Sequence, residues 1–276
     1  MSPKVAKWLS VVLIAAFLLF VAWVLYTIFI WGPAQGDKMP LTLSIGSGPI
    51  TLVQNSTITT RPITTANPVV TLPVASTAGD LLVVVLAQGA NQTTSITSGP
   101  AGFLRAASVQ QLGGDNTSLE IWYYPNNPGG ILAATFVGDP SLYVWSSQIS
   151  EWSGVGAVSP LETSGTATAT GGTTLTPTTS AVLTSTPKLV IAAWMQRLGG
   201  NAAVTFSRPP GYTLLKDEGS VSQISHLDIE YSTTPAAGLV AAPVLTSTGS
   251  TFGASGAVVV FKAGTPATDM TAFLAY

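Results

Sequence analysis

The sequence has no cysteine, a single histidine and few charged residues. Without cysteine there is no disulfide framework, so a domain outside the cytoplasm must be stabilised by its core or by its partners. Charged residues make up only 8% of the 276 residues, against about 25% in an ordinary soluble protein. The formal net charge of −2 supplies no basic surface of the kind that binds nucleic acid.

Charge is missing altogether from residues 8–31, an apolar run bounded by two tryptophans. A helix of this length would extend roughly 36 Å, enough to cross a hydrocarbon core about 30 Å thick. The run therefore predicts one transmembrane helix that contacts the lipid bilayer. The alternative is a cleaved signal peptide, but the run is longer than the roughly 7–15 apolar residues of such a segment.

The charges on either side of this helix predict its orientation. Lys4 and Lys7 precede the helix, whereas Asp37 and Lys38 after it cancel each other. The excess of positive charge places residues 1–7 in the cytoplasm and sends the rest of the chain to the periplasmic or extracellular side. We therefore expect a single-pass membrane protein.

Beyond the anchor, the pattern predicts a linker over residues 32–48, an all-β region over 49–263 and a C-terminal tail over 264–276. Short runs rich in Val, Ile, Thr and aromatic residues alternate with clusters of Gly, Pro, Asn and Ser, which is typical of strands and turns. The predicted strands cover residues 50–53, 69–72, 81–88, 118–124, 131–137, 143–152, 189–195, 211–215, 224–231, 240–245 and 257–262.

The β region also contains an internal duplication. Leu119, Ile121 and Tyr123 recur 108 residues later as Leu227, Ile229 and Tyr231, residues 82–84 recur as 190–192, and residues 100–103 recur as 209–212. We therefore predict two sequence-related halves, residues 67–155 and 175–263, packed face to face as a two-sheet sandwich with a shared core. The Thr-rich stretch 163–186 between them predicts a surface loop with one edge strand, or alternatively an O-glycosylated spacer.

Four short motifs carry a resemblance to a known family. Residues 80–85 (DLLVVV), 102–103 (GF), 120–124 (EIWYY) and 151–154 (EWSG) resemble the pattern of concanavalin-like jelly rolls in phage fibre and bacterial surface proteins. The resemblance covers residues 67–263 and implies a jelly-roll β-sandwich. Its motifs are structural, so it informs the fold rather than the chemistry. The anchor is not part of the family pattern.

The single histidine lies in the one run that suggests chemistry. His226, Asp228 and Glu230 alternate along the predicted strand 224–231, so they share a face and are candidate metal ligands. The preferred interpretation is an ordinary solvated face, since Glu120 occupies the repeat-equivalent place of Asp228 without a histidine beside it. We expect no metal and no cofactor.

The same run is similar to the E-x-D-x-E strand of concanavalin-like glycoside hydrolases. In this sequence His226 stands where the first carboxylate of that motif would be, which removes the nucleophile of a double displacement. The sequence contains no G-x-S-x-G elbow, phosphate loop or dinucleotide fingerprint. We therefore predict no catalytic residue and no enzymatic activity.

Two weaker signals concern ions and glycans. Residues 113–116 (GGDN) offer oxygens to calcium, although a plain hairpin turn is the preferred interpretation. Sequons at Asn55, Asn91 and Asn116 would accept glycans only in an organism that has the necessary machinery.

Aromatic residues supply the candidate partner-binding positions. Trp122 alternates out of phase with its apolar neighbours, so it is predicted to face outward, where tryptophan anchors proteins or sugars. The alternative is that both faces of its strand are covered. The full set of candidates is Trp122, Trp145, Trp152, Phe273 and Tyr276.

Together these features predict a non-catalytic, membrane-anchored structural or accessory subunit that braces neighbouring protein subunits of a membrane or envelope complex. The alternatives are a surface adhesin or carbohydrate-binding, lectin-like module on a cell or virion, with glycan as partner, and an enzyme that acts through His226, Asp228 and Glu230.

Overall fold

The computed structural model describes residues 48–61, 67–89, 96–112, 116–138, 145–184, 187–198, 206–217, 225–235, 237, 241–247 and 251–264. All of them belong to one compact unit, Ile45–Ala267. Every regular element among them is a β-strand, so the prediction of an all-β region is confirmed. Within these ranges no helix is long and apolar enough to span a membrane. The predicted helix 8–31 and the tail residues Phe273 and Tyr276 lie outside the described residues.

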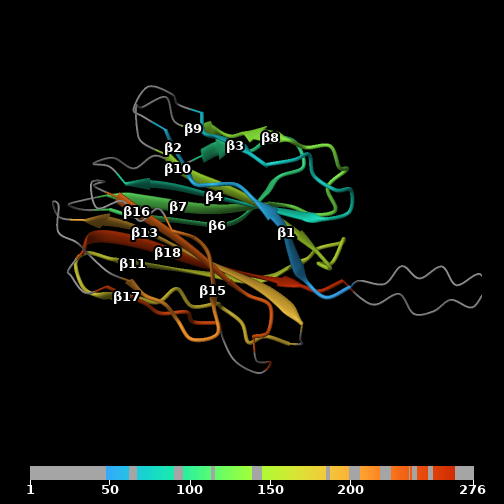
Figure 1. Cartoon of the computed structure of the whole chain (residues 1–276). Coiled ribbons are helices and arrows are strands. Elements are labelled where there is room, and N and C mark those ends of the chain that lie inside the picture. Colours follow the sequence, from blue (N-terminus) through green and yellow to red (C-terminus); the bar gives the residue numbers. More distant parts are fainter. Residues whose placement is uncertain are drawn as a thin grey trace, which may run out of the picture. The chain divides into compact units, whose positions relative to one another are not determined.

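Two large antiparallel sheets dominate this unit (Figure 1). The first large sheet has the order β1 (Thr51–Asn55), β10 (Trp145–Ser153), β4 (Leu81–Gly89), β7 (Thr117–Tyr124) and β6 (Leu104–Gln111), and β2 (Thr59–Arg61) also pairs with β10. The second has the order β11 (Leu161–Ala169), β18 (Thr251–Lys262), β13 (Lys188–Leu198), β16 (Ser225–Ser232) and β15 (Thr213–Asp217).

Three small sheets cover the outer faces of the large ones. On the first large sheet lie β3 (Val69–Thr71) paired with β8 (Ala133–Thr135), and β5 (Ile96–Ser98) paired with β9 (Val137–Gly138). On the second lies a sheet of β12 (Thr174–Leu175), β17 (Leu245–Ser247) and β14 (Phe206–Ser207). The unit therefore has four layers, with the two large sheets in the middle (Figure 1).

The strand pairing repeats along the chain. Val83 of β4 pairs with Tyr123 of β7, and the residues 108 positions later, Ile191 of β13 and Tyr231 of β16, pair in the same way. Each large sheet is thus built from one half of the chain in the same strand order. The sequence repeat and the register agree, so the two halves share one strand arrangement.

Even the irregularities of the sheets repeat. The register of β1 against β10 shifts between Leu52 and Gln54, and that of β11 against β18 shifts between Leu161 and Thr163, 109 positions later. A second pair of shifts relates β6 to β15 in the same manner. Such β-bulges bend a strand locally, so the same bends occur in both halves.

Three apolar cores hold the layers together. The shared core lies between the two large sheets and contains alternate residues of the central strands of both, for example Val83, Val85, Ile191 and Ala193. The remaining alternate residues, such as Val84 and Ala192, belong to two outer cores beneath the small sheets. Strands β4 and β13 are therefore buried on both faces, which explains their nearly continuous apolar sequences.

The connections differ from a jelly roll formed by the two large sheets. Within each half the chain passes back and forth between a large sheet and its small outer sheets, as from β3 to β4 to β5. Each large sheet, by contrast, takes its strands from one half only. The Thr-rich stretch 163–186 contains most of β11, which is an edge strand as predicted, and also the short strand β12, which was not predicted.

Candidate functional site: a pocket beside a buried charged cluster

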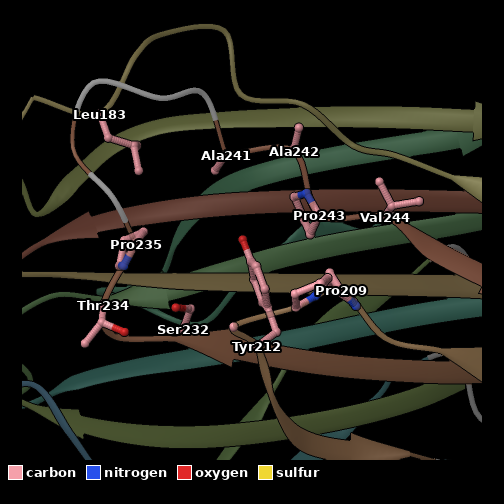
Figure 2. Close-up of a pocket in the computed structure, with 12 residues that line it drawn as sticks. Leu183, Pro209, Tyr212, Ser232, Thr234, Pro235, Ala241, Ala242, Pro243 and Val244 are labelled. Carbon is pink, nitrogen blue, oxygen red and sulfur yellow. The ribbon is translucent and has the colours of Figure 1, made fainter.

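An open pocket of about 340 Å³ lies in the second half, over the outer face of its large sheet (Figure 2). Its walls are prolines, small apolar residues and one tyrosine, with hydroxyl groups but no charged side chain. The lining residues are Leu183, Pro209, Pro210, Gly211, Tyr212, Ser232, Thr234, Pro235, Ala241, Ala242, Pro243 and Val244. In Figure 2 the ring of Tyr212 stands in the middle of the pocket, with its oxygen directed toward the segment from Ala241 to Pro243.

The matching place in the first half is filled with aromatic rings. Phe103 lies edge-on against Tyr124 and Phe136, with ring centroids 5.2 and 5.3 Å apart. Trp122 adds a further edge contact to Phe136 at 5.5 Å. These four side chains belong to the outer core of the first half or pack against it. The first half therefore has a closed aromatic interior at this position.

The pocket results from the residues that replace these rings in the second half. The repeat register puts Ser232 in the place of Tyr124 and Glu230 in the place of Trp122, each 108 positions later. A Cβ added to Gly102 would lie 2.2 Å from the ring of Tyr124, whereas one on Gly211, 109 positions later, would meet nothing within 4 Å. Loss of the ring at Ser232 thus leaves open space beside Tyr212.

Tyr212 is the main polar group of the pocket. Burial, together with the negative charge of Glu230, raises the pKa of the Tyr212 hydroxyl to about 12. The phenol is therefore neutral at physiological pH and can donate a hydrogen bond to an acceptor on a ligand. Its ring packs against the outer core of the second half, which holds the hydroxyl in position.

A charged cluster lies next to the pocket, on the same outer face of β16. His226, Asp228 and Glu230 alternate along this strand and have at most 5% of their surface exposed. The prediction of a solvated face is wrong, because the small sheet and the segment before β15 cover this face. Asp217 lies directly opposite Asp228 on β15, and Arg208 reaches the cluster from the end of β14.

Arg208 is the cation of this cluster. Its Nη2 atom lies 2.7 Å from Oδ2 of Asp217 and 3.3 Å from Oδ2 of Asp228. Its Nε atom lies 2.9 Å from Oε1 of Glu230. One guanidinium group therefore contacts three carboxyl groups, and His226 Nε2 contacts Asp217 Oδ1 at 2.8 Å.

Burial dominates the electrostatics of the cluster. It raises the pKa of Asp228 to about 7 and that of Glu230 to about 8, and the charges of neighbouring carboxylates add to the increase. Burial also lowers the pKa of His226, which favours the neutral imidazole. A hydrogen bond between Asp228 and Glu230 requires that one of the two carboxyl groups keep its proton. The cluster therefore contains more carboxyl groups than the one guanidinium group of Arg208 can neutralise.

The first half has a simpler counterpart. Glu120 occupies the repeat-equivalent position of Asp228 and is also buried. Its carboxylate accepts hydrogen bonds from the backbone N–H of Ile96 at 2.7 Å and from the indole of Trp122 at 2.9 Å. Arg105 completes the set with an ion pair at 3.3 Å. One carboxylate and one arginine balance each other here, so the extra acidic groups are specific to the second half.

The structure corrects the prediction of outward-facing tryptophans. Trp122 is 6% exposed and packs in an outer core, and Trp152 is completely buried in the shared core. Both faces of their strands are covered, which was the alternative interpretation. The side chain of Trp145 lies outside the described residues, and so do residues 113–115 of the predicted hairpin turn, for which calcium binding was the alternative.

Sequence reasoning missed several residues of this region. Arg208 and Asp217 join the cluster from other elements, and no spacing in the sequence links them to His226. The pocket residues Tyr212 and Ser232 were also missed, although comparing the two halves position by position shows the loss of an aromatic residue at Ser232. Neither Asp228 nor Glu230 lines the pocket.

Comparison of the chain with protein-family models, with curated proteins and with solved structures finds no match.

Proposed function

We propose that the chain is a non-catalytic, membrane-anchored structural or accessory subunit whose β-sandwich braces neighbouring proteins of a membrane or envelope complex. The observation that carries the proposal is the open, uncharged pocket around Tyr212 and Ser232. Protein interfaces commonly place an aromatic or aliphatic side chain of one partner in such a pocket of the other. The pocket accordingly receives an apolar anchor residue from a neighbouring subunit.

The packing of the scaffold supports a bracing role. Both faces of the central strands are buried in three cores, and the described part of the chain reaches this packing without a disulfide. Proline is frequent around the pocket, and its fixed backbone angle reduces the entropy lost when the wall is ordered by a partner. A preorganised wall of this kind suits a lasting contact better than a turnover site.

The location of the protein is part of the same proposal. Residues 8–31 form the membrane anchor, the N-terminus is cytoplasmic, and the β-sandwich lies on the periplasmic or extracellular side. Support comes from the uncharged apolar run and from the lysines that precede it. Protease protection of intact cells or of sealed vesicles tests this orientation, because only an exported sandwich is accessible from outside.

Filling the pocket tests the bracing role. Ser232→Tyr restores the aromatic residue that the first half has at Tyr124, and Ser232→Ala is the matched control that leaves the space open. A photo-cross-linking residue at Thr234, on the exposed rim, should trap one defined neighbour in native membranes. Ser232→Tyr should abolish this cross-link and reduce the size of the complex extracted in mild detergent, whereas Ser232→Ala should do neither. A wild-type chain that always runs as a monomer without a cross-link would contradict the proposal.

A second candidate is a carbohydrate-binding module. The hydroxyl groups of Tyr212, Ser232 and Thr234 line the same pocket, and the face of a tyrosine ring packs well against the C–H groups of a sugar. A glycan array probed with wild type, Ser232→Ala and Ser232→Tyr separates the two candidates. Selective glycan binding that is lost in Ser232→Tyr would favour the module over the structural subunit. Glycan binding by wild type that is no higher than that of Ser232→Tyr would rule out the carbohydrate-binding module.

A further inference from the structure

Three potential metal-binding atoms come together in the charged cluster of the second half. One donor atom from each of Asp217, His226 and Asp228 can be chosen such that all three lie within 4.8 Å of one another. Asp217 and Asp228 are cross-strand partners between β15 and β16, and His226 lies two residues before Asp228 on the same face. The sheet itself therefore positions the three side chains.

The distances between the three donor atoms span the distance expected between two ligands of one metal ion. Ligand atoms about 2.0–2.1 Å from a tetrahedral zinc ion are about 3.4 Å from one another. In the cluster His226 Nε2 and Asp217 Oδ1 are 2.8 Å apart, and the separations among the three donor atoms all lie within 4.8 Å. Small side-chain rotations would bring all three atoms to the separation that a bound ion requires.

A second observation indicates that a cation is needed here. Oδ1 of Asp228 and Oε2 of Glu230 are buried, and apart from a proton held between these two carboxyl groups they meet no hydrogen-bond donor in the described part of the chain. A buried acceptor without a partner costs about 1–3 kcal/mol, and more when it is charged. In the first half, by contrast, both oxygens of Glu120 have donors.

The charge balance leads to the same conclusion. The cluster contains three carboxyl groups, from Asp217, Asp228 and Glu230, and one guanidinium group, from Arg208. If a bound cation displaced the proton held by Asp228 and Glu230, the four groups would carry an excess of two negative charges, which one divalent cation would neutralise. The first-half counterpart pairs Glu120 with Arg105 and has no such excess.

From this geometry we infer that Asp217, His226 and Asp228 bind one divalent cation of the zinc type. An imidazole nitrogen combined with carboxylate oxygens suits zinc better than calcium or magnesium, which prefer oxygen ligands alone. Arg208 contacts Asp217 and Asp228 through one oxygen of each and so orients both carboxylates. Asp217 is 27% exposed and provides the route from solvent. The ion links β15 to β16 in the second half and is independent of the pocket's occupant.

Metal binding by the intact chain tests this inference. The full-length protein is purified in detergent, treated with a chelator, dialysed and titrated calorimetrically with zinc, manganese, calcium or magnesium chloride. We expect one equivalent of zinc to bind, with weaker manganese binding and none of calcium or magnesium. At a zinc concentration 100 times the dissociation constant, the melting temperature should rise by about 5–10 °C.

Three amide or near-isosteric variants make the test specific. His226→Gln and Asp228→Asn should each weaken zinc binding by about 100-fold or more, because each removes a ligand. Asp80→Asn is the control, since it removes a carboxyl group from the first half and should bind zinc like wild type. Circular dichroism checks that each variant is folded. The absorption of tetrahedral cobalt(II), which reports the ligand set directly, should appear in wild type and in Asp80→Asn only.

Two outcomes would overturn the inference. In the first, no metal binds stoichiometrically, so protons alone satisfy the cluster. In the second, His226→Gln and Asp228→Asn bind zinc as tightly as wild type, so the ion lies elsewhere. Ser232→Tyr should leave zinc binding unchanged, which distinguishes failure of the metal site from failure of the proposed bracing function.

Discussion

Trp152 of β10 and Tyr231 of β16 lie edge to face across the boundary between the two halves, with their ring centroids 4.9 Å apart. The repeat-related contact joins Tyr123 of β7 to Phe261 of β18 at 5.3 Å. In the repeat, Tyr123 corresponds to Tyr231 and Trp152 corresponds to Phe261. Interchanging the two halves therefore converts one of these contacts into the other. The shared core is therefore approximately two-fold symmetric, as at the interface of a homodimer.

The first prediction concerns this symmetric core. Trp152→Ala and Phe261→Ala each remove a fully buried ring, so both should lower the free energy of unfolding by about 3–5 kcal/mol. Val158→Ala, at an 84% exposed position, should change it by less than about 0.5 kcal/mol. Chemical denaturation followed by fluorescence measures all three. A large loss in one ring variant with almost none in the other would contradict equal packing of the two halves.

A matched pair of glycines tests the difference between the halves. Gly102 and Gly211 both have positive φ, +89° and +81°, so Gly→Ala imposes similar backbone strain at each. At Gly102 the new methyl group also collides with Tyr124, whereas at Gly211 it meets only open space. Gly102→Ala should therefore be less stable than Gly211→Ala by about 1–3 kcal/mol. Equal losses in thermal denaturation would mean that the second half has no open space at this position.

The carboxyl group of Asp80 predicts a dependence of stability on pH. Burial, together with a hydrogen bond to Glu151 and that residue's charge, raises the pKa of Asp80 to about 6. Between about pH 4 and 6 the folded protein thus keeps a proton that the unfolded chain has released, and stability falls as pH rises through this range. Solvent screening at this partly exposed site limits the effect to about 1 kcal/mol or less.

Asp80→Asn should remove this contribution. The amide still donates a hydrogen bond to Glu151 but cannot ionise, so the variant should match wild type near pH 4 and exceed its melting temperature at pH 7. Melting curves at pH 4, 5, 6 and 7 in detergent compare the two proteins. A difference that does not change with pH would rule out Asp80 as the titrating group.

A buried ion pair in the second half predicts an asymmetric response to mutation. The side chain of Lys188 is completely buried and pairs with Glu162, which also accepts two hydrogen bonds from Thr184. Burial lowers the pKa of Lys188, with a further contribution from Lys262. Glu162→Gln leaves the ammonium group without its carboxylate and should cost about 3–5 kcal/mol.

Replacing the lysine of this pair instead of the glutamate should lower the free energy of unfolding much less. Lys188→Met keeps the volume of the buried chain, and Glu162 retains its bonds to Thr184. The double variant, Lys188→Met with Glu162→Gln, should recover most of the stability lost in Glu162→Gln alone. Urea denaturation of the two single variants and the double variant checks this order. A double variant less stable than Glu162→Gln would contradict the prediction, because the unpaired ammonium group would then not be the source of the loss.

The sequence predicted the structure best where the hydrophobic pattern lies entirely within one strand. The apolar runs of β4 and β13 and the alternation of Leu, Ile and Tyr in β7 and β16 predicted these strands and their repeat. Strand β6 was not predicted, and β11 was predicted only as one edge strand without bounds, because each is rich in polar residues with no clear alternation. The small outer sheets consist of strands of two or three residues, which are too short to form a pattern.

These small sheets also explain the errors at the candidate site. Trp122 and the run from His226 to Glu230 do lie opposite the shared core, as alternation predicted. That side is nevertheless covered, since residues distant in sequence fold over it. The partners Arg208 and Asp217 depend on strand pairing, which spacing along one strand does not contain. The resemblance to concanavalin-like jelly rolls and the membrane anchor stay predictions.

The covalent link between the two related halves has a consequence for how they can change. In a dimer of identical chains, every substitution appears on both sides of the interface, so a cavity opened in one copy weakens the other as well. Here a single chain supplies both copies, and the interface forms at an effective concentration that dilution cannot alter. The first half can therefore keep its buried aromatic rings, while the second half has a pocket and a charged cluster in the corresponding place. The two halves stay associated despite this difference because they belong to one chain.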